Sequence, residues 1–164
     1  MAYLRSLLFC TLFFFLGYQS AHAQNDLLPK MTGWINDYGK LLNPEQAKEL
    51  TAMVKKYQKR TERGIVVVTV DSIASYMDMT TYSDDIGDYW DLLRIFKNNS
   101  LIIAICGPCH GICINTRFGS GKKLPEAECK KIVDEIMIPD FRKGDYYLGL
   151  KNGIIAIIEK WEKK

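Results

Sequence analysis

The chain has 164 residues, a length typical of one domain built around a single hydrophobic core. Its formal net charge is only +3, and its 22 Lys and Arg residues are dispersed along the sequence. The chain therefore lacks the basic patch typical of nucleic-acid-binding proteins, and this function class is not indicated.

The first 23 residues have the pattern of a secretory signal peptide. Arg5 precedes an apolar run over residues 7–16, and Ala21-His22-Ala23 supplies an A-x-A cleavage site. The run is short for a membrane span, with an uncleaved N-terminal anchor as the alternative. We expect an exported protein, periplasmic or secreted, with a signal peptide over 1–23 and an extended lead over 24–31. A single domain over 32–164 should follow, without a transmembrane helix in the mature chain.

The first helix of the mature chain has a clear predicted start, after a segment rich in turn formers over residues 33–39. Asn43-Pro44-Glu45-Gln46 supplies an N-cap, a proline at the first helical position and a capping-box glutamine. The apolar positions that follow recur at helical spacing and predict a buried stripe: Ala47, Leu50, Met53, Val54 and Tyr57. We expect Gly64 to end this helix.

A continuous apolar run over residues 65–70 predicts a buried strand that ends at Asp71. Ligand sites in open α/β sheets collect beyond the carboxyl ends of strands, so Asp71 is a candidate site residue. A carboxylate that caps a loop is the simpler interpretation.

Residues 82–93 predict a second helix. Its inward-facing positions are Tyr82, Ile86, Tyr89, Trp90 and Leu93, and its other face carries Asp84, Asp85, Asp88 and Asp91. Such a run of carboxylates is more typical of a solvated surface than of a cation site. Asn98-Asn99 then predicts a turn.

Residues 101–123 are the most informative stretch. The apolar run 101–105 predicts a central strand, and the Gly-Pro and Gly residues within 106–111 predict a tight reversal. Residues 112–118 then alternate, with Ile112, Ile114, Thr116 and Phe118 on one face and Cys113, Asn115 and Arg117 on the other. This is a β-hairpin that leads into Gly119-Ser120-Gly121, with Arg117 at the mouth of the glycine loop.

Two helices complete the chain. The first begins at Pro125, buries Cys129, Ile132, Val133, Ile136 and Met137, and should stop at Pro139. Asp145 can cap the second, which carries apolar residues up to Trp161. The order α-β-α-β-β-α-α predicts an α/β fold, a three-layer α/β/α sandwich with a short mixed sheet.

The cysteines at the hairpin tip match several motifs. Cys106-Gly-Pro-Cys109 has the spacing of a dithiol oxidoreductase, but that chemistry needs a helix after the first cysteine, and a strand is predicted here. A haem attachment site with His110, a zinc site that adds Cys113 and a structural or labile disulfide are the alternatives. A hairpin tip that happens to contain cysteines remains the simplest interpretation, and we expect neither haem nor NAD.

The glycine loop resembles a phosphate-binding loop only in part. Thr116 stands where a P-loop requires glycine, and Lys123 stands where it requires Ser or Thr. An anion site made of loop amides with Arg117 and Lys122 remains as a weaker hypothesis.

From about residue 28 to 161 the chain resembles the TPM domain family, also called the TPM phosphatase family, exported or membrane-tethered domains of bacteria and chloroplasts. The resemblance rests on an ordered set of landmarks: 33–37 with Leu41-Leu42, 64–72, Trp90, 97–99, 118–121 with Leu124-Pro125, Ile138-Pro139, 141–146 and Gly149. It implies an α/β/α sandwich, and members have been linked to weak acid-phosphatase activity, calcium binding and assembly roles beside membrane complexes.

The resemblance also implies which polar residues line a cleft. It points to Asp71 and Arg117 as catalytic residues, to Asp37, Asp71 and Asp145 as ligands of a metal such as calcium, and to Asn98, Asn99, Gly119 and Gly121 as ligand-binding residues. Lys122-Lys123 stands where relatives often carry an acidic residue, which weakens the metal-dependent interpretation.

Two functions follow as hypotheses. In the first, the chain is a non-catalytic or weakly catalytic binding or assembly factor with a partner protein in the cell envelope. In the alternative, it is a calcium-dependent, acid phosphatase-like hydrolase in which Asp37 and Asp71 hold the metal and Arg117 steadies a phosphate. We favour binding, because His110 is the only histidine left after signal cleavage and no nucleophile–base pair is evident.

Overall fold

The computed structural model describes residues 28–163, so the predicted signal peptide lies outside the described residues. The chain divides into two units, Met1–Lys30 and Met31–Lys164, and the second carries all the helices and strands discussed below. None of the helices in the described part combines the length and the apolar composition that crossing a bilayer requires.

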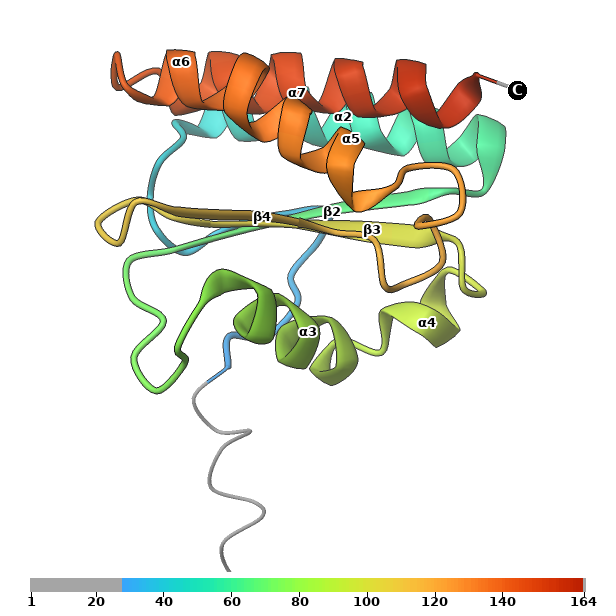
Figure 1. The fold of residues 1–164 in the computed structure, drawn as a ribbon, viewed down its shortest axis with the longest axis horizontal. Coiled ribbons are helices and arrows are strands. Elements are labelled where there is room, and N and C mark those ends of the chain that lie inside the picture. Colours follow the sequence, from blue (N-terminus) through green and yellow to red (C-terminus); the bar gives the residue numbers. More distant parts are fainter. Residues whose placement is uncertain (1–27, 164) are drawn as a thin grey trace, which may run out of the picture. The chain divides into compact units, whose positions relative to one another are not determined.

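A four-stranded mixed sheet forms the middle layer (Figure 1). Its strands lie in the order β1 (Ile35–Asp37), β2 (Gly64–Val70), β3 (Ser100–Cys106) and β4 (Gly111–Asn115). The first three are parallel, and β4 pairs antiparallel with β3 as the predicted hairpin. Every residue of β2 and β3 is buried, which explains why both strands are continuous apolar runs.

Helices cover both faces of the sheet. One face carries α2 (Pro44–Thr61), α5 (Glu126–Lys131), the π-helical turn η2 (Ile132–Met137), α6 (Ile138–Phe141) and α7 (Tyr146–Glu162). The other carries α3 (Met79–Tyr89) and α4 (Leu92–Ile95). The predicted three-layer α/β/α architecture is confirmed. Its larger core lies under α2 and α7, where Leu50, Ile154 and Trp161 pack against β2 and β3.

Strand β1 was not predicted, because its residues lie in a segment rich in turn formers. The side chain of Asn36, 1% exposed, holds this strand in place. Its Oδ1 accepts from the amides of Thr32 (2.8 Å) and Gly33 (3.1 Å), and its Nδ2 donates to the carbonyls of Gly33 (2.9 Å) and Val67 (3.1 Å). A buried amide thus replaces the long apolar run that usually marks a strand.

Helix α2 starts as predicted, with the reciprocal capping box of Asn43 and Gln46, but it ends earlier than expected. Its C-cap is Glu62 in the left-handed conformation (φ 60°), and Gly64 is the first residue of β2. Gly64 is needed for packing instead, since a Cβ there would lie 2.5 Å from the Phe96 ring.

The single helix predicted over residues 82–93 is in fact two. The chain breaks at Asp91, whose φ is 54°, and α4 then starts in a new direction. Tyr89 and Leu93 were predicted to face inward, and this is wrong: they are 37% and 40% exposed, whereas Leu92 is fully buried.

Strand β4 also ends earlier than predicted, at Asn115, and the chain turns away from the ladder. Phe118 was expected on the face of Ile112 and Ile114, which is wrong. Its ring packs under α3, where a Cβ on Gly87 would lie 2.2 Å from it.

Pro139 does not stop the helix before it, contrary to the prediction. It is the second residue of α6, a position where a missing N–H breaks no hydrogen bond within that helix. The π-helical turn η2 leads into α6 without a loop. The last helix begins as predicted, with the Asp145 side chain as its N-cap.

Candidate functional site

Asp37 and Asp71 lie at the carboxyl edge of the parallel strands. Asp37 ends β1, and its carboxylate accepts hydrogen bonds from the amides of Leu41 (3.0 Å) and Leu42 (2.9 Å) and from the Thr69 hydroxyl. These bonds fix the turn that leads to α2. Asp71 follows β2 directly and is exposed.

The third predicted metal ligand, Asp145, caps α7, and its Oδ1 accepts from the amide of Leu148 at 2.8 Å. Among the described residues, no group of three or more His, Cys, Asp or Glu side chains is placed to hold a metal ion. The structure therefore does not gather Asp37, Asp71 and Asp145 into one ligand set.

The predicted ligand-binding residues lie at the opposite, amino edge of the parallel strands: Asn98, Asn99, Gly119 and Gly121. Gly119 has φ 110°, and a Cβ there would lie 1.8 Å from the Asn98 carbonyl oxygen, so only glycine fits. The Asn99 carbonyl accepts from the Gly64 amide at 2.9 Å. These contacts hold the start of β3 against its neighbours. Gly119 and Asn99 therefore both have a structural role.

Arg117 is engaged with carboxylates of α3. Its guanidinium lies 2.8 Å from Asp88 and 3.8 Å from Asp84, and 5.4 Å above the ring of Phe118. The hydrogen bond to Asp88 raises the pKa of Arg117 further. The acidic face of α3 is thus partly neutralised by a residue of the glycine loop region.

The two predicted catalytic residues lie far apart. Arg117 follows β4, whose Asn115 pairs with Ile102 near the start of β3. Asp71 follows Val70, which pairs with Cys106 at the end of β3. At about 3.3 Å per residue, the seven residues of β3 separate the two edges by roughly 20 Å. Asp71 and Arg117 do not share a cleft.

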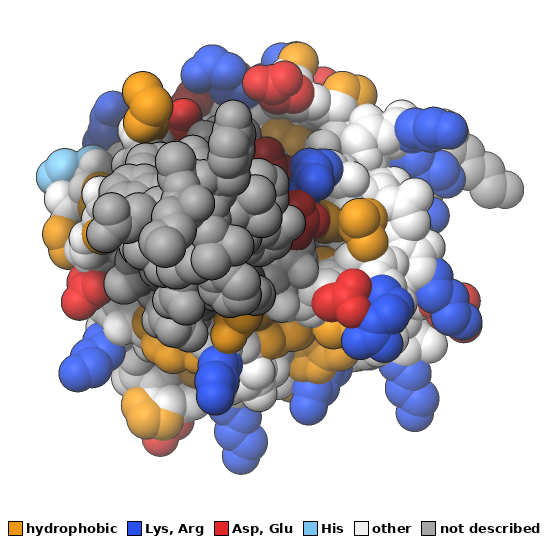
Figure 2. All heavy atoms as spheres, turned by 90° about the horizontal axis from the view of Figure 1, so that it is seen from below, with side chains coloured by type: hydrophobic (Ala, Val, Ile, Leu, Met, Phe, Trp, Pro, Cys, Tyr) orange, Lys and Arg blue, Asp and Glu red, His pale blue; other side chains and the backbone are white. Residues whose placement is uncertain are grey.

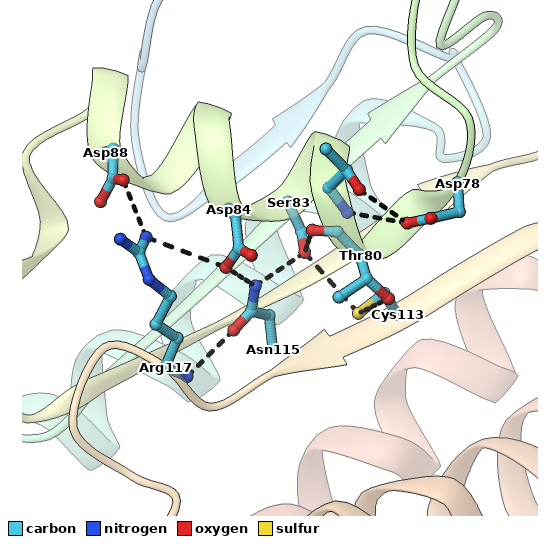
Figure 3. A network of polar contacts seen from close by, with 9 residues as sticks. Asp78, Thr80, Ser83, Asp84, Asp88, Cys113, Asn115 and Arg117 are labelled. Atoms are coloured by element: carbon cyan, nitrogen blue, oxygen red, sulfur yellow. Dashed lines mark hydrogen bonds and ion pairs between the residues drawn. The ribbon is translucent and has the colours of Figure 1, made fainter.

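A polar network links β4 to α3 (Figure 3). Asn115, 7% exposed, donates from Nδ2 to Ser83 Oγ and Asp84 Oδ1, both at 2.8 Å, and its Oδ1 accepts from the Arg117 amide at 2.9 Å. The Ser83 hydroxyl also lies 3.6 Å from the thiol of Cys113. Every polar atom of the Asn115 amide thus has a partner, as a buried amide requires.

The two free thiols in the described part of the chain are not activated. Burial raises the pKa of Cys113, and burial raises the pKa of Cys129 to about 12. Both sulfurs are therefore protonated at neutral pH, and neither has the depressed pKa of a catalytic cysteine. Cys129 is buried on α5, as predicted for a core thiol.

The other two cysteines within residues 28–163 form a disulfide at the hairpin tip. Cys106 and Cys109 are bonded, with 5.2 Å between their Cα atoms. In this state their sulfurs are not available as metal ligands or for haem attachment. Strand β4, and not a helix, begins at Gly111 after this loop. The loop therefore lacks the helix N-terminus that activates a redox dithiol.

Two adjoining cavities lie along β4, and we call them together the β4 groove. The first, about 470 Å³, is lined by the hairpin tip, Ile112 and residues of α6 and α7 such as Phe141 and Tyr146. The second, about 480 Å³, is lined by residues 110–114, by residues 78–80 at the start of α3 and by residues of α5 and η2 such as Cys129 and Val133. Both share Ile112 and Ile138, so the groove follows the edge strand between the two helical layers.

Neither this groove nor the Asn115 network could be predicted from the sequence. Ile112 and Ile114 were recognised as one face of a strand, but the position of that strand at the sheet edge depends on strand order. An isolated Asn115 within an apolar strand was the one available signal for a buried polar contact.

Charged side chains are dispersed on the visible part of one face, in agreement with their spread along the sequence. On the visible part of the face that carries α3 and α4, basic side chains are spread apart and mixed with acidic ones (Figure 2). No basic patch gathers there.

Comparison with known proteins agrees with the fold. The family model of the TPM domain matches residues 35–160. No curated protein matches the chain. Among solved structures, the N-terminal domain of a protein from P. gingivalis is 23% identical, with a TM-score of 0.71 over 79% of this chain and 82% of that one.

Two further bacterial structures share the fold. The BA42 protein from Bizionia argentinensis is 17% identical, with a TM-score of 0.63 over 73% of this chain and 81% of that one. The N-terminal domain of the cg2496 protein from Corynebacterium glutamicum is 15% identical, with a TM-score of 0.57 over 83% and 86% of the two chains. At these identities the likeness concerns the fold alone. The family match spans nearly the whole described unit, and the chain belongs to the TPM domain family.

Proposed function

We propose that this TPM domain is a binding domain that docks a partner protein in the β4 groove and carries out no chemistry of its own. The observation that carries this proposal is the pair of adjoining cavities along an edge strand, lined largely by apolar side chains. Concave, mostly apolar surfaces with a few polar groups are the usual binding sites of proteins.

The contacts of the predicted metal-binding and catalytic residues support the same conclusion. Asp37 fixes a turn, Asp145 caps a helix and Arg117 is paired with Asp88. Each of these side chains has a structural role that a substrate or metal would have to displace.

The alternative is a calcium-dependent hydrolase that uses Asp37, Asp71 and Arg117. It fits the geometry less well, because a phosphate bound at Arg117 would lie at the other edge of the sheet from a metal at Asp71. It would require a rearrangement of the Arg117 ion pairs as well.

We place the proposed partner in the cell envelope. The first 23 residues have the pattern of a signal peptide, and the Cys106–Cys109 disulfide would persist in an oxidising compartment. Both features support an exported protein whose partner lies outside the cytosol.

Site-specific photo-cross-linking in cells that make the protein tests the proposal. Lys130, in the β4 groove, is replaced by p-benzoylphenylalanine; the matched control places the same group at Lys55, an exposed lysine on α2. We expect a discrete adduct with one protein from position 130 and none from position 55.

Two results would contradict the binding function. One is an equal yield of adducts from both positions. The other is an absence of adducts from position 130 together with aryl phosphate hydrolysis by the purified protein that Asp71→Asn abolishes.

A further inference from the structure

The backbone direction of β3 can be derived from two hydrogen bonds. The Asn99 carbonyl accepts from the Gly64 amide of β2 at 2.9 Å, whereas the Ser100 amide donates to the Phe118 carbonyl, on the β4 side, at 2.8 Å. The N–H and C=O of one strand residue point to the same side, and they alternate from residue to residue. The even-numbered residues of β3 therefore face β4.

The register then fixes which groups of β4 point outward. The even-numbered residues of β3 pair with Gly111, Cys113 and Asn115. These three residues thus direct their backbone groups toward β3. The N–H and C=O groups of Ile112 and Ile114 point the other way, to the open edge of the sheet.

The β4 edge lacks the usual features that protect an edge strand. Its sequence, Gly-Ile-Cys-Ile-Asn, contains no proline and no charged residue. Ile112 and Ile114 line the second cavity, whose two walls are α3 on one side and α5 with η2 on the other. An added strand would pass between these walls, with alternate side chains directed to each.

The two walls differ in chemistry. On the α3 side the groove offers Asp78 and Thr80, both polar and exposed. On the other side, the apolar Cys129, Val133 and Ile138 stand beside the charged Glu126, Lys130 and Asp134. An extended segment with alternating polar and apolar residues matches this difference.

The charge of the groove determines which kind of polar residue a bound segment should carry. Lys130 and Asp134 neutralise each other at 2.8 Å. Asp78 caps α3 by accepting from the Thr81 amide at 2.8 Å, but neither Asp78 nor Glu126 has an ion-pair partner among the described residues. Two carboxylates thus remain. They attract a basic segment, and they disfavour a second copy of the same edge, which would bring like charges together.

We propose that β4 accepts an extended, alternating apolar and basic segment of the partner protein as a fifth strand of the sheet. This inference rests on the proposed binding function and specifies its mode. The main-chain groups of Ile112 and Ile114 provide hydrogen bonds, and the two walls select the side chains.

The probe is the hexapeptide acetyl-Val-Lys-Val-Lys-Val-Lys-amide, titrated into the ¹⁵N-labelled protein. We expect saturable shifts of the Ile112 and Ile114 amide signals, and weaker binding by Asp78→Asn, in which an amide oxygen still caps α3. An absence of shifts at these two amides overturns the proposal.

Backbone methylation of the probe separates strand addition from simple side-chain binding. One peptide is N-methylated at its three Val residues and the other at its three Lys residues, so the two have the same composition and charge. In an added strand only one of these sets faces β4, and that peptide should bind about tenfold or more weakly, since several hydrogen bonds are lost. Equal affinity of both methylated peptides overturns the proposal.

A protein variant gives an independent test. Ile112→Pro removes an outward N–H that plays no part in the β3 pairing, whereas Ile112→Val keeps it. We expect only the proline variant to lose the peptide. Shifts at Ile112 and Ile114 that grow with protein concentration, without peptide, would instead indicate a second copy and overturn the proposal.

Failure of this inference is distinguishable from failure of the proposed function. A cross-link from position 130 without strand addition leaves the binding function standing and removes only its mode.

Discussion

The Asn115 amide shows how single residues hold β4 in position. Its three hydrogen bonds tie the strand to Ser83 and Asp84 of α3 and to the backbone of Arg117. Asn115 and Ser83 are both buried, so water is poorly placed to replace the hydrogen bond between them. The network therefore contributes to stability and also fixes the strand that forms the floor of the β4 groove.

Asn115→Ala should lower the free energy of unfolding by about 1–3 kcal/mol, because it removes three hydrogen bonds of a buried amide, one of them to the buried Ser83 hydroxyl. Asn99→Ala is the matched control, since within the described residues its side chain makes a single long hydrogen bond, 3.5 Å to the Glu62 carbonyl. We expect a change within about 0.5 kcal/mol for the control. Chemical denaturation measures both, and equal losses in the two variants would show that the network adds nothing.

Contacts between residues close together in the sequence could be predicted, and contacts between residues far apart in the sequence could not. The caps at Asn43 and Asp145 were predicted, because a cap contacts residues three positions away. The partners of Asn115 lie 31 and 32 residues away, and only the folded sheet brings them together.

At the scale of elements, the ends of helices depend on packing as well as on local sequence. Glycine is the residue type that commonly ends a helix, but Gly64 does not end α2. Glycine is required at position 64 because the Phe96 ring packs against it, and Glu62 forms the left-handed cap instead. The chain tolerates a residue with a Cβ in a conformation that favours glycine.

Glu62→Gly should therefore stabilise the protein by up to about 1 kcal/mol, because glycine relieves the left-handed strain at a small entropic cost. Glu62→Ala keeps the Cβ and should give no gain. Thermal or chemical unfolding of the two variants measures the difference. A loss of stability in the glycine variant would show that the Glu62 side chain stabilises the cap in some other way.

Element predictions were wrong where long-range contacts override local pattern. Strand β1 has only three residues and depends on Asn36. Pro139 is tolerated because it is the second residue of α6, where no hydrogen bond within that helix is lost. Long periodic segments such as α2 and α7 were recognised, since their apolar stripes extend over several turns.

At the scale of the whole molecule, the apolar runs of β2 and β3 were enough to predict the α/β class. The position of the site was not predictable in the same way. The resemblance to the TPM family placed Asp71 and Arg117 in one cleft, but residues after parallel and antiparallel strands leave the sheet at opposite edges. Strand order also makes β4 an edge, and that order is a property of the assembled sheet.

The open edge of β4 is the physical basis of both proposals, and backbone amide hydrogen exchange in the free protein tests it most directly. The amides of Cys113 and Asn115 should be protected by β3, while those of Ile112 and Ile114 should exchange roughly a hundredfold faster or more. Equal, slow exchange of all four amides would show that the edge is already covered, and would contradict the account.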